Sequence, residues 1–275
     1  MDYKDLMDSL FFNTDIVLED MQKGLTNHNY LLEMNNEKLV LRVPGSDADQ
    51  IVERHHETLA LEAIKDADID VETIYYDEIS GYKVTRYMEN ALTYGECQDE
   101  NKIEQVAALM KKFHGLHKLI HEDFDPLKRL HNYQSQVQHP CVDVSEFAWI
   151  EDSISHLNNP KVLCHNDWVD GNMLFCNHRV YLIDYEYAAD NDPLFDVMSF
   201  LSENQITDET LRERFYAVYF DEMNDQIRKE LDLWENFHNY LWCYWAMMMY
   251  ESRREDVYKD IAMDKYQALM HKNQA

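Results

Sequence analysis

The sequence HNDWVDGN at residues 165–172, together with YLIDYEY at residues 181–187, decides the fold of this chain. Asp167 is a carboxylate that can accept a proton, Asn172 follows five residues later, and Asp184 comes after a short predicted hairpin. A carboxylate base and oxygen ligands for Mg²⁺ are the groups that phosphoryl transfer from Mg-ATP uses. The pattern therefore indicates a kinase, with Asp167 as the base and Asn172 and Asp184 as metal ligands.

The residues around these stretches predict a strand, a loop and a hairpin. A strand over 161–164 leads into the loop, and strands over 173–176 and 179–183 are joined by the turn dipeptide Asn177-His178. The two metal-ligand candidates border this hairpin, one at its start and one at its end. We therefore expect the base and the metal ligands to gather at one end of a small sheet. Each residue alone also fits a turn or a helix cap, whereas the joint pattern favours catalysis.

Other residues of this region have weaker interpretations. Glu186 is a possible further metal ligand. His165 could be a catalytic imidazole, but in a loop of this type such a side chain more often braces the backbone by hydrogen bonding. The set Cys164, His165, Cys176 and His178 fits no recurrent zinc spacing. We therefore predict a structural role for His165 and no zinc site.

The strongest compositional bias is a net charge of −28 over 275 residues, spread along the chain. Such a field disfavours contact with nucleic acid and with anionic membrane surfaces, and it raises the local concentration of cations. The charge suits a cationic substrate, although simple solubility is the more common reason for such a charge, and the charge alone does not choose between them. A hydrophobic fraction of 45%, with six glycines and five prolines, is typical of a globular chain with few disordered linkers.

Cysteine usage and the apolar runs bear on the compartment. Five cysteines without framework spacing indicate reduced thiols. Residues 1–5, MDYKD, do not have the pattern of a signal peptide, and the most apolar run, residues 240–250, is too short to span a bilayer. We expect a cytoplasmic protein with no nucleic-acid partner and no stable membrane association.

The pattern of elements changes near residue 88. Before it, the sequence predicts a small antiparallel sheet with one main helix, and from residue 101 the pattern is mainly helical as far as Leu119. The fold class is thus α+β, and the length favours two lobes, here residues 1–88 and 89–275. The elements predicted for the first lobe are strands over 15–21, 28–34, 38–43, 71–76 and 81–87 and a helix over 49–65.

Residues 164–172 and 183–187 resemble the choline/ethanolamine kinase family, part of the larger group of aminoglycoside-phosphotransferase-like kinases, and are most similar to its bacterial choline kinases. The resemblance extends over about residues 24–266 and implies the two-lobed protein-kinase-like fold. The first lobe would then bind nucleotide, and the second would carry catalysis and substrate binding. By the same resemblance, Asp167 is the catalytic base and the two ligand candidates hold Mg²⁺.

The resemblance also identifies a nucleotide loop near the N-terminus. Residues 24–30, GLTNHNY, are similar to the loop that lies between the first two strands of these kinases and covers the phosphates of ATP. It implies that Gly24, Thr26 and Asn27 bind the nucleotide. One glycine makes a weak glycine-rich loop by itself, and the segment could be a plain hairpin turn.

A basic residue follows on the next strand. Residues 39–45, LVLRVPG, resemble the strand from which these kinases direct a cation toward the ATP phosphates, and Arg42 stands at that position. An exposed strand arginine is the alternative interpretation. On the following helix, Glu57 is the predicted ion-pair partner of Arg42, although Glu53 lies one turn earlier and could serve instead.

The predicted substrate-binding residues lie further along the chain. By resemblance, Asp196 anchors the catalytic loop and Glu203 faces the cationic head of the substrate. Residues 241–246, LWCYWA, resemble the stretch in which two tryptophans, here Trp242 and Trp245, line the substrate pocket. Tryptophan faces attract a quaternary ammonium through cation–π interaction, whereas aromatic residues at helical spacing can also be plain core.

The resemblance predicts an ATP- and Mg²⁺-dependent kinase that phosphorylates the hydroxyl of choline to give phosphocholine. Ethanolamine kinase is the nearest alternative, followed by a thiamine or aminoglycoside kinase, and a catalytically silent kinase-like binding protein is a further one. Two departures weaken the substrate assignment more than the reaction type: Val169 replaces a polar residue after the catalytic loop Asp, and the segment around Tyr258 tracks the family only loosely.

Overall fold

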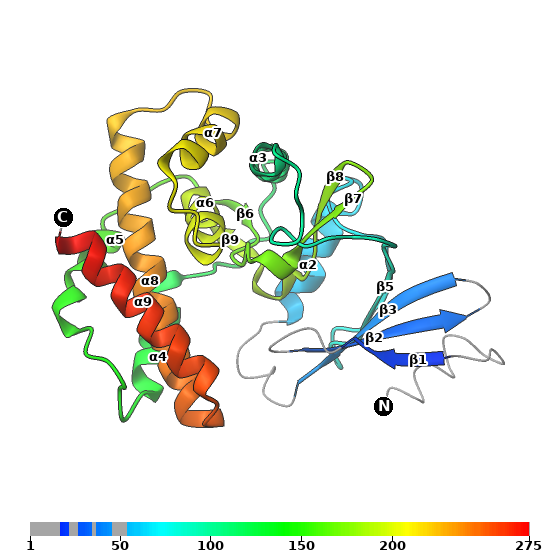
Figure 1. Ribbon diagram of the computed structural model, residues 1–275, viewed down its shortest axis with the longest axis horizontal. Helices are drawn as coiled ribbons and strands as arrows, with labels where there is room; N and C mark the ends of the chain where they lie inside the picture. Colours follow the sequence, from blue (N-terminus) through cyan, green and yellow to red (C-terminus); the bar gives the residue numbers. More distant parts are fainter. Residues whose placement is uncertain (1–16, 22–26, 35–36, 46–53, 275) are drawn as a thin grey trace. The chain divides into compact units, whose positions relative to one another are not determined.

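The structure, a computed structural model, describes residues 17–21, 27–34, 37–45 and 54–274 (Figure 1). By internal packing the chain divides into two compact units. Unit 1 comprises the chain up to Ile120 together with Asp170–Ala188, and unit 2 comprises His121–Val169 and Ala189–Ala275. The predicted boundary at residue 88 concerns functional lobes rather than packing, and it stays a prediction.

An antiparallel sheet of five strands, in the order β1-β2-β3-β5-β4, belongs to unit 1. One face carries a small core of Leu32, Leu39, Leu41 and Val84. Because successive side chains of a strand point to opposite faces, Arg42 lies on the other face from Leu41. The sheet therefore separates this apolar core from the face that carries Arg42. The strands are β1 (Val17–Asp20), β2 (Asn27–Met34), β3 (Glu37–Pro44), β4 (Thr73–Tyr76) and β5 (Lys83–Arg86).

Helix α2 (Arg54–Ile64) is the one main helix predicted between the third and fourth strands. Its buried residues, Glu57, Ala60 and Ile64, are spaced three and four apart and therefore share one face. Residues 49–53, which the prediction included, lie outside the described residues. A glutamate on the buried face of a helix needs a cationic or hydrogen-bonding partner.

Unit 1 is completed by helix α3 (Lys102–His114) and by the hairpin of β7 (Met173–Cys176) and β8 (Arg179–Leu182). Asn177 and His178 at the hairpin turn both have positive φ, 50° and 62°, as a two-residue type I′ turn requires. The hairpin prediction is thus confirmed. The predicted helical face up to Leu119 was too long, because the helix ends at His114.

Unit 2 is mainly helical, and its longest helix, α8, packs against α4, α5, α6 and α9. In Figure 1, α8 and α9 lie side by side. Asn224 caps the N-terminus of α8 by accepting from the backbone N–H of Ile227. The helices are α4 (Pro126–Gln136), α5 (Trp149–Ser155), α6 (Pro193–Glu203), α7 (Glu209–Tyr219), α8 (Asp225–Arg253) and α9 (Asp256–Gln274).

The strand before the predicted catalytic loop, β6 (Val162–Cys164), pairs with β9 (Ala189–Asn191) in unit 2. It does not join the β7–β8 hairpin, so the expected single small sheet is wrong. A strand of three residues can pair with either neighbour, and local pattern does not distinguish them. The α+β fold class is confirmed. Among the described residues, no helix is long and apolar enough to cross a membrane.

Candidate active site

A buried ion-pair network lies at the centre of unit 1. The guanidinium of Arg42 contacts Glu57 Oε2 at 2.5 Å and Asp184 Oδ1 at 2.6 Å. The predicted partner Glu57 is therefore confirmed, and the alternative, Glu53, lies outside the described residues. Burial acts to lower the pKa of Arg42, but the two carboxylates outweigh it and raise that pKa above its ordinary value. Arg42 thus stays charged although only 8% of it is exposed.

Lys83 is a second buried cation in this network, and the sequence reasoning missed it. It stands opposite Arg42 in the pairing of β3 with β5, so both side chains lie on the same face of the sheet. Its Nζ lies 3.4 Å from Glu57 Oε1 and 3.8 Å from Asp70 Oδ2. Burial acts to raise the pKa of Glu57, but Arg42 and Lys83 lower it overall. One glutamate therefore serves two buried cations.

Asn172 and Asp184 come together at one end of the β7–β8 hairpin. The backbone N–H of Ile183 donates to the carbonyl oxygen of Asn172 at 2.9 Å, which places the two predicted ligands on adjacent strand ends. Asp184 adopts a left-handed conformation, φ 68°, which Asp tolerates better than most residues. Side-chain oxygens of both types are ligands that Mg²⁺ accepts.

Glu186 is a buried carboxylate close to this pair. Its Oε2 accepts a hydrogen bond from Asn27 Nδ2 at 2.9 Å. Burial, and then the charge of Asp184, raise the pKa of Glu186 to about 7. The donor set therefore carries more negative charge than this part of the chain neutralises, and it fits a bound divalent cation. The contact between Arg42 and Asp184 is itself explained by their opposite charges.

A cavity of about 300 Å³ opens on the face of the sheet that carries Arg42. Arg42 and Lys83 contribute positive charge to its lining, and Asn172 and Asp184 also line it. Cations beside an apolar slot suit a ligand with both an anionic and a flat apolar part, which is the chemistry of a nucleotide. Its apolar lining includes Val40, Val71, Met88, Ala91, Leu174 and Ile183.

The predicted phosphate loop is only partly described. Gly24 and Thr26 lie outside the described residues, so their predicted contacts stay predictions. Asn27, the first residue of β2, is buried and reaches Glu186. That contact ties the start of β2 to the predicted metal ligands within unit 1.

The catalytic loop in unit 2 is anchored by Asp196 of α6, as the resemblance implied. Its Oδ2 accepts from the backbone N–H of His165 at 2.8 Å, and its Oδ1 accepts from that of Asn166 at 2.7 Å. On the other side of Asp167, the backbone N–H of Trp168 donates to Ser199 Oγ at 2.9 Å. Both neighbours of the predicted base are therefore fixed to the same helix, while Asp167 itself is partly exposed.

His165 has the surroundings of a structural residue. Its side chain is fully buried and lies edge-on to Trp168, with ring centroids 6.0 Å apart. The hydrogen bond that holds its backbone goes to the buried carboxylate of Asp196. These surroundings agree with a structural role, and the predicted hydrogen bond from the His165 side chain to the loop backbone stays a prediction.

The predicted substrate residues lie on α6 and α8 of unit 2. The rings of Trp242 and Trp245 meet edge to face at 6.0 Å, and Trp245 meets Tyr258 in the same way at 5.7 Å. Trp242 Nε1 donates to His238 Nδ1 at 3.1 Å. The tryptophans thus form one aromatic group with Tyr258, a residue that the sequence left unassigned. Glu203 is paired with Lys265 of α9.

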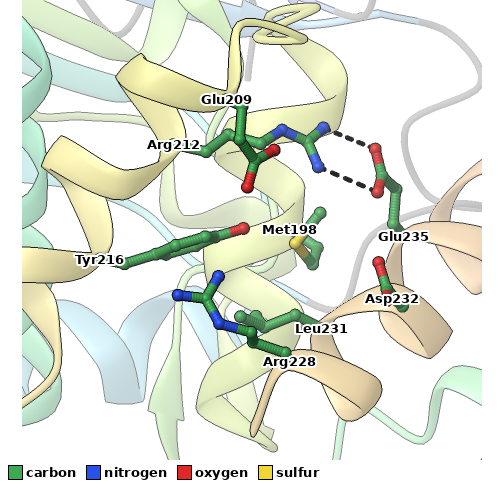
Figure 2. A pocket seen from close by; sticks show the side chains of 8 residues that line it. All are labelled: Met198, Glu209, Arg212, Tyr216, Arg228, Leu231, Asp232 and Glu235. Atoms are coloured by element: carbon green, nitrogen blue, oxygen red, sulfur yellow. Dashed lines mark hydrogen bonds and ion pairs between the residues drawn. The ribbon is translucent and has the colours of Figure 1, made fainter. Parts of the chain in front are cut away.

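A second cavity, of about 160 Å³, lies among α6, α7 and α8 (Figure 2). Arg212 and Glu235 face each other across it and form two hydrogen bonds, of 3.0 and 2.6 Å. Burial raises the pKa of Glu235, but Arg212 and Lys272 outweigh it and lower that pKa to about 2. None of the predicted site residues lines this cavity.

The antiparallel sheet, the helix-borne glutamate paired with a strand arginine, and the anchored Asp167 loop are the features expected of a kinase-like small-molecule phosphotransferase. The solved structure of the choline kinase LicA from Streptococcus pneumoniae has the same fold, with a TM-score of 0.84 over 98% of both chains at 23% sequence identity. A structure of LicA in complex with AMP matches with a TM-score of 0.81 at 24% identity, over 98% of this chain and 97% of that one.

The sequence profile of the choline/ethanolamine kinase family matches residues 18–227, and the chain belongs to this family. Protein LicA of Haemophilus influenzae is 27% identical over 248 residues, which are 83% of this chain and 72% of that protein. The predicted family is confirmed. The chain is a choline kinase-like phosphotransferase that acts on the alcohol group of a small molecule.

Proposed function

We propose that this protein is a choline kinase, which transfers the γ-phosphoryl group of ATP to the hydroxyl of choline and releases phosphocholine and ADP. The observation that carries the proposal is the buried Arg42, held between Glu57 and Asp184 at the wall of a nucleotide-sized cavity. A cation kept in place beside carboxylate and amide oxygens suits a Mg-triphosphate, because phosphoryl transfer is mainly positioning and charge stabilisation.

The proposed nucleotide site uses residues of unit 1. Arg42 contacts the phosphates, and Asn27 supports the loop that precedes it, together with the predicted Gly24 and Thr26. Asn172 and Asp184 hold Mg²⁺, with Glu186 as a further ligand. When bound, Mg²⁺ neutralises the charge that develops on the phosphates.

The proposed chemistry at the acceptor uses Asp167. Its carboxylate orients the choline hydroxyl and takes its proton as the new O–P bond forms and the bond to the ADP oxygen breaks. Asp196 keeps the backbone on the N-terminal side of Asp167 in place, since it accepts two of its N–H groups. A base held in this way contributes about 10²- to 10⁴-fold in rate.

Trp242, Trp245 and Glu203 are the proposed residues for the cationic head. A trimethylammonium has no N–H to donate and is bound through aromatic faces, whereas a primary ammonium needs acceptors. The aromatic group of Trp242, Trp245 and Tyr258 supports choline over ethanolamine. Ethanolamine stays the second candidate because the family includes kinases for both alcohols.

We also propose that ATP is the donor and that the nucleotide-binding lobe ends at residue 88. The proposed location is the cytoplasm, because all five cysteines are free thiols, which suits a reducing compartment.

A competition assay tests the proposed function. The enzyme is given ATP and Mg²⁺ with choline, ethanolamine, thiamine and kanamycin together, and each phosphorylated product is quantified by mass spectrometry. We expect phosphocholine to dominate. A dominant phosphoethanolamine would refute the aromatic argument, and no product from any of the four would favour the catalytically silent alternative.

A further inference from the structure

Glu203, at the end of α6, already has a cation partner within the chain. Lys265 of α9 donates to its Oε1 at 2.6 Å, and the lysine and glutamate side chains are only 12% and 16% exposed. The hydroxyl of Ser202 donates to the same oxygen at 3.4 Å. The carboxylate predicted to meet the cationic head of the substrate is therefore neutralised by the protein's own lysine.

The Glu203–Lys265 pair lies close to the tryptophan group. His238 of α8 accepts the indole N–H of Trp242 at 3.1 Å. Cys243, between the two tryptophans, donates its thiol to the carbonyl oxygen of Ala262 at 3.5 Å, and Ala262 lies one helical turn before Lys265 on α9. Helix α8 packs against both α6 and α9, which carry the two charges. The lysine therefore belongs to the surroundings of the predicted cation pocket.

We propose that Lys265 is a positioning residue that sets selectivity among cationic alcohols by holding Glu203; this rests on the proposed function. While Lys265 holds Oε1, the Glu203–Lys265 pair has no net charge, and this oxygen of Glu203 is already occupied by a donor. A primary ammonium has three N–H groups that need acceptors, whereas a trimethylammonium has none. Occupation of the Glu203 oxygen by Lys265 therefore weakens the binding of a primary ammonium more than that of a trimethylammonium. The pair therefore favours choline over ethanolamine.

Replacement of Lys265 by methionine tests this inference, because Lys265→Met removes the charge and keeps much of the apolar stem. The readout is the ratio of kcat/KM for ethanolamine to kcat/KM for choline. A freed, partly buried carboxylate gains a charge-assisted hydrogen bond from a primary ammonium, so we expect the ratio to rise about tenfold, mainly through a lower KM for ethanolamine. In Lys265→Met/Glu203→Gln the ratio should return to near the wild-type value, because the carboxylate is gone.

Lys272→Met is the matched control. Lys272 lies on the same helix and contacts two carboxylates, Asp232 at 2.9 Å and Glu235 at 2.6 Å, neither of which is a predicted substrate residue. Its ratio should stay at the wild-type value. An unchanged ratio in Lys265→Met, or an equal rise in Lys272→Met, overturns the inference while choline turnover by the wild type upholds the proposed function. A wild type that phosphorylates neither alcohol overturns both.

Discussion

Glu57 carries the charge on which two buried cations depend, so Glu57→Gln is the most informative perturbation of unit 1. Arg42 and Lys83 are 8% and 4% exposed, and both contact this one carboxylate. Removing one partner of a buried ion pair costs about 3–5 kcal/mol, because the remaining charge is left uncompensated. Arg42 keeps Asp184 at 2.6 Å and Lys83 keeps Asp70 at 3.8 Å, so the lower end of that range applies.

We therefore expect Glu57→Gln to lower the free energy of unfolding by about 3 kcal/mol in urea at pH 7, with an unchanged slope m. Glu62→Gln is the matched control on the same helix. Its side chain is 69% exposed and its partner Lys65 is 56% exposed, so the expected loss is at most about 0.5 kcal/mol. A loss below about 1 kcal/mol in Glu57→Gln would refute the argument that the network is tightly coupled and desolvated.

Three further variants test the catalytic loop and the core of unit 2. Asp167→Asn removes only the base, so it should lower kcat by about 10³-fold and leave the dissociation constant of ADP, measured by calorimetry, unchanged. If the affinity for ADP fell by the same factor as kcat, the role of Asp167 as the base would be contradicted. Asp196→Asn should lower the free energy of unfolding by about 2 kcal/mol, because a buried charged acceptor of two backbone N–H groups is lost. An unchanged free energy of unfolding would contradict the role of Asp196 as the anchor of the loop. Burial lowers the pKa of His238 from 6.5 to about 4, so below pH 6.5 the unfolded chain takes up a proton on this imidazole before the folded chain does. The contribution of His238 to the free energy of unfolding is therefore fully present above pH 6.5 and is lost as the pH falls toward 4. The wild type should lose about 2 kcal/mol more than His238→Gln between pH 7 and pH 5, and equal losses would contradict this.

Local patterns predicted much of this chain because the relevant contacts are close in sequence or follow from strand alternation. The hairpin turn at Asn177 and His178 needs only two residues that tolerate positive φ. Arg42 stands between apolar residues on its strand, so strand alternation alone places it on the opposite face of the sheet from Leu41. Glu57 lies on the helix that follows this strand, and only 15 residues separate it from Arg42.

Contacts between distant segments could not be predicted in the same way. Lys83 and Asp70 join the network through the order of strands in the sheet, which no local pattern specifies. Strand β6 is three residues long and pairs with a strand 25 residues later. Lys265 reaches Glu203 across 62 residues, and only the packing of three helices brings them together.

The central claim is that the chain phosphorylates choline, and ³¹P NMR of one reaction tests it most directly. The purified protein is incubated with ATP, Mg²⁺ and choline, and the phosphorus resonances are followed over time. We expect the γ-phosphate resonance of ATP to disappear while resonances of ADP and of a phosphomonoester, phosphocholine, grow in equal amounts. Unchanged ATP, or hydrolysis to inorganic phosphate without the ester, would contradict it.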